Sequence, residues 1–258
     1  SEMCIRDRGD AALAGAEFTW HYYDGLYTKD NLPEKATRTW VTKTVAEKDS
    51  NGTVHYVTKL VDAYKVSGDV FYTQNEKNVL PLGTLTVEET KAPDGYLLDG
   101  AYMQAGDITE QIKGMYLTQI TEDGELAVLS GSNQYSVSDQ VIRGGVKIQK
   151  RDLETKDTKA QGSATLKDTA FAIISLNENS VLVEGKLYKK NETVKTIQTG
   201  NDGIATTSAD LLPYGKYKLE ETKAPEGFEL DKGVYSVFIE KDETTYEVCL
   251  LYTSDAAD

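Results

Sequence analysis

The segment LPLGTLTVEETKAPDGYLLD at residues 80–99 recurs as LPYGKYKLEETKAPEGFELD at residues 212–231. About 12 of the 20 aligned positions are identical, at a constant offset of 132 residues. Self-similarity at a fixed offset indicates repeated structural units. The sequence therefore predicts two related domains in tandem within its 258 residues.

Each copy of the repeat is predicted to be a strand that ends in a turn. Apolar and polar residues alternate up to Glu89 in the first copy and Glu221 in the second. Because the side chains of a strand alternate between its two faces, each glutamate points to the apolar face. Pro93 and Pro225 end the strand, and the glycine two residues later permits a turn. Each domain thus places a carboxyl group at the end of a buried strand face.

An ionised carboxylate in an apolar environment is unfavourable, and such a group commonly responds by binding a proton. Glu89 and Glu221 are therefore candidates for a functional role. The alternative is that both lie partly in water at the strand ends, where amides of the turn donate hydrogen bonds to them. The strand pattern alone leaves both interpretations open.

The second copy contains the longer motif YKLEETKAPEGF at residues 217–228. It resembles the E-box of the SpaA-like, collagen-adhesin B-type domains of Gram-positive pilins and surface adhesins, and the resemblance covers both domains. It implies an all-β chain of tandem immunoglobulin-like or prealbumin-like β-sandwich domains. In that family the glutamate assists an autocatalytic amide (isopeptide) bond between a lysine on the first strand and an asparagine or aspartate on the last.

Val146, Ile148 and Lys150 alternate on one face of the expected first strand of the second domain. Burial makes a lysine amine less basic, so that part of it is neutral and nucleophilic. The family pattern V-x-I-x-K-x-D matches residues 146–152, and the resemblance implies that Lys150 is the amine donor. The residues alone are also consistent with a lysine whose amine reaches solvent at the strand end.

The closing strand of the first domain is expected at residues 134–141, where Asp139 faces inward. The resemblance implies that Asp139 is the acceptor of the first domain, although asparagine is commoner at this place. An aspartate that binds the following turn is the alternative. In the second domain the alternation of Tyr246 and Val248 brings the acceptor to about position 252, which is Tyr252.

We expect the first domain at residues 9–143, without its first strand, and the second at residues 144–248, truncated in its last strand. Residues 1–8 and 249–258 resemble translations of a transposase sequencing adapter, so we exclude them from the fold. The missing signal and sorting segments then indicate an internal fragment. Cys4 and Cys249 both lie in these tails. A genuine disulfide between them is the alternative.

Weaker patterns predict the remaining elements of the chain. They are a hairpin of residues 37–46 with 54–63, a strand around 69–73, a surface loop at 100–114, a hairpin of 116–120 with 126–129, a linker at 143–145 and a hairpin of 186–190 with 193–199.

Composition and motifs exclude several classes of function. The net charge of −14 argues against nucleic acid and anionic membranes as partners, and no apolar run is long enough for membrane insertion. His21 and His55 lie on separate strands without ligands at metal spacing, and no nucleotide-binding loop or nucleophile elbow occurs. The paired glutamates of each repeat point to opposite faces and cannot act as the two acids of a glycosidase. We therefore expect no cofactor and no metal.

These observations favour a structural and adhesive part of an extracellular, cell-wall-anchored surface protein or pilin. Its partners would be neighbouring domains of the same protein, and single-turnover self-modification would not make it an enzyme. The alternative is a stalk-borne module that binds host matrix protein or glycan through the aromatic strand at residues 18–23, together with Tyr27 and Trp40. The same aromatic residues are also consistent with cross-strand core pairs.

Overall fold

The computed structural model describes residues 13–105, 111–122, 135–152 and 154–250. The chain divides into two compact units, an N-terminal unit at Ala12–Gln140 and a C-terminal unit that contains Val141–Asp258. Within the described ranges the regular structure is β-strand apart from the short 3-10 helix η1 (Asp62–Tyr64). The prediction of an all-β chain is therefore confirmed.

The N-terminal unit contains strands β1 to β12, and β12 ends at the first residue of the next unit. The strands are β1 (Glu17–Tyr23), β2 (Arg38–Lys43), β3 (Val45–Lys48), β4 (Val54–Val57), β5 (Lys65–Gly68), β6 (Tyr72–Gln74), β7 (Lys77–Val79), β8 (Gly83–Lys91), β9 (Tyr96–Ala105), β10 (Gln111–Lys113), β11 (Tyr116–Ile120) and β12 (Tyr135–Val141).

The main sheet of the N-terminal unit has the order β11-β8-β1-β2-β5, and a second sheet has the order β10-β9-β12. Large side chains from the central strands cover one face of the main sheet. Trp20 and Tyr22 of β1, Trp40 of β2 and Leu85 of β8 are all nearly inaccessible to solvent. Each such side chain contributes about 1.5–3 kcal/mol through burial, so this face is the core of the unit.

The C-terminal unit contains strands β13 to β22. They are β13 (Arg143–Lys150), β14 (Ala170–Ser175), β15 (Val181–Val183), β16 (Lys186–Tyr188), β17 (Thr193–Gln198), β18 (Ile204–Thr206), β19 (Leu212–Pro213), β20 (Gly215–Lys223), β21 (Val234–Ile239) and β22 (Thr244–Leu250).

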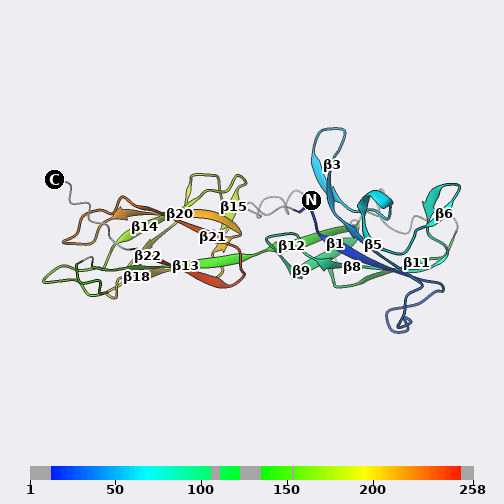
Figure 1. Cartoon of the computed structure of the whole chain (residues 1–258), viewed down its shortest axis with the longest axis horizontal. Helices are drawn as coiled ribbons and strands as arrows, with labels where there is room; N and C mark the ends of the chain where they lie inside the picture. The colour runs from blue at the N-terminus through cyan, green and yellow to red at the C-terminus, as the bar shows by residue number, and fades with distance from the viewer. Residues whose placement is uncertain (1–12, 106–110, 123–134, 153, 251–258) are drawn as a thin grey trace. The chain divides into compact units, whose positions relative to one another are not determined.

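Two sheets of the C-terminal unit enclose one core. One has the order β17-β14-β20-β21, and in the other β13 pairs with β18, β19 and β22 (Figure 1). Ile148 of β13, Phe171 of β14 and Leu219 of β20 are fully buried in the same cluster, so side chains of both sheets interdigitate. The first strand β13 and the last strand β22 run parallel, with Ile148 opposite Val248.

The two copies of the sequence repeat occupy equivalent places in the two units. In the N-terminal unit β8 lies between β1 and β11, and in the C-terminal unit β20 lies between β14 and β21. Phe18 pairs with Glu89, and Phe171 pairs with Glu221. In both units the register shifts immediately before the phenylalanine. Such a bulge changes the direction in which the neighbouring side chains point. Because both units have the bulge at the equivalent place, it orients Glu89 and Glu221 in the same way.

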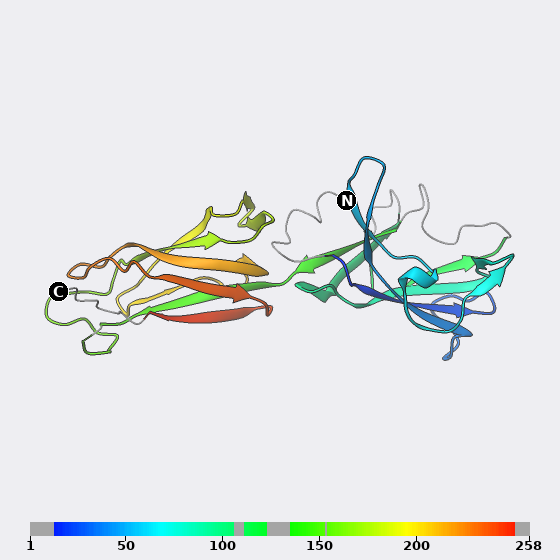
Figure 2. The same ribbon diagram turned by 45° about the horizontal axis from the view of Figure 1, so that its top comes forward.

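The hairpin expected around residues 49–52 forms, but it is shorter than predicted. Strands β3 and β4 pair with each other, and Figures 1 and 2 show the hairpin standing away from the sheets. Asp49 Oδ1 accepts hydrogen bonds from the amides of Asn51 and Thr53, and Gly52 has a φ of 82°. The expected strand at 54–63 ends at Val57, and η1 follows it. Of the strand expected around 69–73, only residues 72 and 73 lie in a strand, β6, because β5 ends at Gly68.

Two predicted connections are wrong. Within the surface loop expected at 100–114, residues 100–105 belong to β9 and residues 111–113 form β10, and the two strands pair through backbone hydrogen bonds that require no apolar pattern. The strand at 186–188 pairs with β15 rather than with β17. Glu184 and Gly185 separate β15 from β16 and both have positive φ, which is the backbone of a tight two-residue hairpin turn.

The segment at 143–145 is the beginning of β13 and not a linker. Gly144 and Gly145 are buried, and a Cβ atom on Gly145 would lie 2.2 Å from the carbonyl oxygen of Ser208. These glycines therefore allow close approach of neighbouring backbone rather than flexibility. At the other end, β22 continues to Leu250, two residues beyond the expected limit of 248. Residues 126–129 of the other expected hairpin lie outside the described residues.

Candidate functional site

Lys150 and Glu221 meet in the interior of the C-terminal unit. Lys150 is the last residue of β13 and is fully buried, as are Val146 and Ile148 on the same face. The side chain of Glu221 on β20 is also fully buried, and Lys150 Nζ donates a hydrogen bond to Glu221 Oε2. Because β13 and β20 belong to different sheets, this ion pair bridges the two layers. The alternatives of a solvent-exposed lysine and a solvent-exposed glutamate are therefore wrong in this unit.

The ring of Phe171 forms one wall of this site. Its centroid lies 6.0 Å from Lys150 Nζ, and Phe171 is the residue that pairs with Glu221 across β14 and β20. A cation at this distance from an aromatic ring is weakly attracted by it. Sequence reasoning assigned no role to this phenylalanine. The N-terminal unit has the same pairing, between Phe18 and Glu89, but the spacing along the chain differs, 71 residues there and 50 here, so no fixed spacing in the sequence reveals it.

Burial and the lysine act on Glu221 in opposite directions. Removal from water raises the pKa of the Glu221 carboxyl, and the hydrogen bond and charge of Lys150 oppose this rise. Glu221 Oε1 is buried, and no described side chain donates a hydrogen bond to it, while the backbone of Asp231 also acts to lower the pKa of this carboxyl. The carboxyl group is thus suited to hold a proton at one oxygen while the other contacts the amine.

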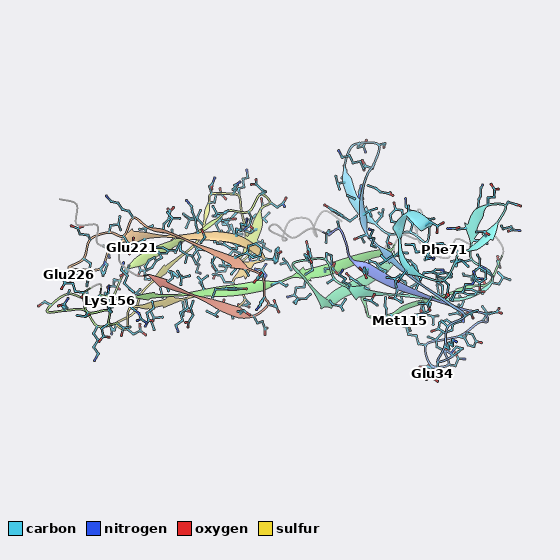
Figure 3. All side chains as sticks on the ribbon, in the orientation of Figure 1. Glu34, Phe71, Met115, Lys156, Glu221 and Glu226 are labelled. Atoms are coloured by element: carbon cyan, nitrogen blue, oxygen red, sulfur yellow. The ribbon has the colours of Figure 1, made fainter. Side chains whose placement is uncertain are left out.

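The aspartate of the V-x-I-x-K-x-D motif organises the loop that follows β13. Asp152 is 4% exposed, and its Oδ1 accepts hydrogen bonds from the amides of Glu154 and Thr155 and from Gln161 Nε2. These bonds, that of the Thr155 amide first, lower the pKa of Asp152. In Figure 3 Glu221 lies at the end of the unit that also carries Lys156 of this loop. Asp152 therefore holds the loop that begins directly after β13.

The pairing of β13 with β22 places Lys150 beside the last described residues of the chain. Lys150 lies opposite Leu250, which is the last described residue. The expected acceptor position at Tyr252 lies outside the described residues. Both cysteines likewise have no described side chain, so the alternative disulfide stays a prediction.

Glu89 and Asp139 come together in the N-terminal unit. The Asp139 carboxyl faces Glu89 closely enough for the two groups to share a proton. Burial, and then the charge of Asp139, raise the pKa of Glu89 to about 9. Burial also raises the pKa of Asp139. Apart from each other, the buried oxygens Glu89 Oε1 and Oε2 and Asp139 Oδ1 have no hydrogen-bond partner in the part of the chain that the structure describes.

The aromatic strand does not form an open contact surface. Phe18, Trp20, Tyr22 and Tyr23 are each at most 8% exposed, and Trp40 is inaccessible. The prediction that residues 18–23 form a binding face is therefore wrong, because both ends of this strand pack into the core. The alternative interpretation as core residues holds.

The described residues contain neither a metal-binding cluster nor a membrane-spanning helix. Among the described residues no cluster of three or more His, Cys, Asp and Glu side chains is suited to hold a metal ion. No described helix has the length and apolar character needed to cross a bilayer. His55 Nε2 instead contacts Asp49 Oδ2 at 3.0 Å in the exposed β3–β4 hairpin.

A β-sandwich whose first and last strands pair in parallel over a buried lysine–glutamate pair defines the C-terminal unit as a prealbumin-like domain. Residues 146–250 match the SpaA family, described as a prealbumin-like fold domain. The match thus covers most of the C-terminal unit and none of the N-terminal unit. A search of curated protein sequences found no match.

Several solved structures are similar to the chain. The Bacillus anthracis TIE protein is 21% identical with a TM-score of 0.47, covering 94% of this chain and 31% of that one. A streptococcal ancillary pilin is 21% identical with a TM-score of 0.29, covering 95% and 60%. BcpA, the major pilin subunit of Bacillus cereus, is 15% identical with a TM-score of 0.34, covering 95% and 97%. The chain thus spans less than two thirds of the first two structures.

Proposed function

We propose that this chain is a structural and adhesive part of a cell-wall-anchored Gram-positive surface protein or pilin. Its domains are of the type stabilised by intramolecular Lys–Asn or Lys–Asp isopeptide bonds. The observation that carries the proposal is the fully buried Lys150–Glu221 pair beside the parallel strands β13 and β22. The SpaA match at residues 146–250 supports the class of surface protein. The partners are neighbouring domains of the same protein.

The chemistry follows from the burial of both groups. The neutral amine of Lys150 attacks the side-chain carbonyl of an acceptor on the extension of β22. Glu221 donates a proton to the carbonyl oxygen and then carries a proton from the amine to the leaving group. With asparagine as the acceptor, one C–N bond forms, one C–N bond breaks and ammonia leaves. The dry interior and strand pairing hold the reacting groups together. Since the reaction happens once, the protein is not an enzyme with turnover.

The cross-link would stabilise the domain by constraining its unfolded state. Closing a loop of about 100 residues contributes ~4–5 kcal/mol in the chain-entropy treatment used for disulfides. It would also join β13 covalently to β22, so that a pulling force passes through the covalent bond rather than through the backbone hydrogen bonds.

The N-terminal unit is proposed to be a second domain of the same kind, within residues 9–143, with the C-terminal domain at 144–248. The equivalent positions of β8 and β20 and the shared bulge support this proposal. Glu89 takes the role of Glu221, and Asp139 is the acceptor, from which water leaves instead of ammonia.

Restoring an acceptor in the C-terminal unit tests the proposal. We expect the unaltered chain to have the mass of its sequence, whereas Tyr252→Asn should lose one ammonia on intact mass spectrometry. Position 252 lies outside the described residues, and continued alternation along β22 predicts that it falls on the same face as Val248. Peptide mapping should find Lys150 joined to the new asparagine.

Three matched variants serve as controls for this experiment. Thr253→Asn places the same acceptor on the opposite face and should keep its full mass. Adding Lys150→Arg or Glu221→Gln to Tyr252→Asn should prevent the loss, because the nucleophile or the proton carrier is missing. A Tyr252→Asn chain whose C-terminal unit is folded by hydrogen exchange but which retains its full mass would overturn the proposed chemistry.

A further inference from the structure

Strand β21 is an open edge of the C-terminal unit. It forms one end of the sheet β17-β14-β20-β21, and its six residues pair with β20 without any shift in register. Among the described residues no strand pairs with the other side of β21. That side therefore presents backbone amides and carbonyls in the arrangement that a further strand needs.

The other edge strands of the two main sheets in this unit carry features that discourage pairing. Natural proteins protect the edges of sheets with charged side chains, bulges, proline or short strands. Strand β17 carries Lys195 and is bulged where it pairs with β14, β18 has only three residues, and β22 carries Glu247. The sequence VYSVFI of β21 has no charge, no proline and no bulge. Of these four edges, β21 is thus the one suited to pair with another chain.

The side chains of β21 that point away from the core are apolar at both ends of the strand. Val237 and Ile239 belong to the core cluster, so Val234, Ser236 and Phe238 lie on the outer face. Val234 is 58% exposed. An aliphatic group at one end, an aromatic ring at the other and a small hydroxyl between them can pair with their own copies in the antiparallel direction.

One antiparallel register between two copies fits these side chains. When Ser236 lies opposite Ser236 of a second copy, Val234 of each chain lies opposite Phe238 of the other. Just beyond the strand, Lys232 then lies opposite Glu240 of the other copy, once at each end of the interface. Both residues are exposed, and no ion pair within the described part of the chain engages them. This register thus joins opposite charges at both ends.

Neighbouring registers fit less well. Residues that lie opposite each other must share one face of the sheet, so a shift of one residue would set outer side chains against core side chains. A shift of two residues in either direction separates Val234 from Phe238 and Lys232 from its acidic partner. In one direction it also brings Val234 opposite the carboxylate of Glu240. The sequence of β21 and its flanks therefore favours the register centred on Ser236.

We propose that two copies of the chain associate through antiparallel pairing of β21 in this register. Because the same surface is used on both copies, the arrangement has two-fold symmetry and stops at a dimer. The two four-stranded sheets become one sheet of eight strands. Neither Lys150 nor Glu221 lies on β21, so the inference stands independently of the amide chemistry proposed above.

Sedimentation velocity of the whole chain over a range of concentrations tests the association. We expect a reversible equilibrium between monomer and dimer without larger species. Hydrogen exchange at low and high concentration should show that amides of β21 become protected as the dimer forms, whereas those of the edge strand β17 do not. A chain that stays monomeric up to about 1 mM would overturn the proposal, and so would assemblies that keep growing with concentration.

A charge at the symmetry axis tests the centre of the register. Ser236→Lys sets two ammonium groups opposite each other and should weaken dimerisation by at least about tenfold. Ser236 is exposed, so the substitution leaves the core of the unit unchanged. Thr196→Lys places the same charge at an exposed position of β17 and should leave the dimer unchanged. Equal effects of the two substitutions would overturn the proposed surface.

Exchanging the charges at the two ends tests the register itself. Lys232→Glu or Glu240→Lys alone should weaken dimerisation about tenfold, because each end then holds two like charges. The double variant Lys232→Glu with Glu240→Lys restores opposite charges and should recover the affinity of the unaltered chain. A double variant that dimerises as weakly as the single ones would overturn the pairing of these two residues and the register with it.

Discussion

Glu221 faces a lysine in the C-terminal unit, whereas Glu89 faces an aspartate in the N-terminal unit. The surrounding framework is nearly the same, since each glutamate pairs with a phenylalanine next to a bulge in the neighbouring strand. The difference arises from which other strand approaches the glutamate, β13 in one unit and β12 in the other. The fold thus positions the carboxyl group, and a separate strand determines its charge partner.

This difference has opposite consequences for the two glutamates. The amine of Lys150 opposes the effect of burial on Glu221, while the charge of Asp139 adds to the effect of burial on Glu89. The C-terminal unit therefore contains a compensated pair, in which the charge of Lys150 offsets that of Glu221. The N-terminal unit contains an acidic pair, Glu89 and Asp139, which is stable when at least one of its carboxyl groups is protonated.

The largest expected effect comes from removing one member of the compensated pair. Glu221→Ala leaves the fully buried Lys150 without its carboxylate and should destabilise the C-terminal unit by about 3–5 kcal/mol. The matched variant Glu89→Ala should cost the N-terminal unit clearly less, because it leaves only Asp139, which can remain neutral. Hydrogen exchange at increasing urea concentration would report each unit separately. Equal losses in the two units would contradict the contrast.

A second prediction concerns pH. Burial, followed by the Asp139 charge, raises the pKa of Glu89 from 4.5 to about 9. Between these values the folded state binds more protons than the unfolded state, so the N-terminal unit loses stability as the pH rises. The full contribution is present below pH 4.5 and is lost by about pH 9. The slope for one proton is at most about 1.4 kcal/mol per pH unit.

The C-terminal unit should show a shallower slope, because Lys150 opposes the rise in the pKa of Glu221. Urea unfolding from pH 5 to pH 9, followed by hydrogen exchange, would compare the units in one sample. Glu89→Gln should flatten the profile of the N-terminal unit only. An N-terminal unit that gains stability toward pH 9 would show that the acidic pair is not protonated in the folded state.

Much of the site could be predicted from the sequence because it depends on short-range rules. The period of two residues along a strand turns Lys150, Glu221 and Glu89 toward the interior, and the structure buries all three carboxyl or amine groups. The repeat itself identifies β8 and β20 as equivalent strands. Proline and glycine in the repeated turn show where these strands end.

Strand pairing was harder to predict because it depends on long-range contacts. Residues 186–188 have the same local pattern whether they pair with β15 or with β17, and the two-residue turn at Glu184–Gly185 decides for β15. Strands β9 and β10 pair without an apolar alternation that would reveal them. The contact of Glu89 with Asp139 joins two different sheets, and no periodicity within either strand contains that information.

The smallest expected effect isolates burial as the cause of the contrast. Lys147 lies three positions before Lys150 on β13, and its Nζ is 2.9 Å from Glu247 Oε1 on β22. These two side chains are 38% and 65% exposed, so water and salt screen their attraction. Lys147→Ala should therefore change the stability of the C-terminal unit by no more than about 1 kcal/mol, and by less at high salt. The measurement is urea unfolding at low and high ionic strength beside Glu221→Ala. A loss as large as that of Glu221→Ala would mean that charge pairing along β13, rather than burial of the amine, distinguishes the two units.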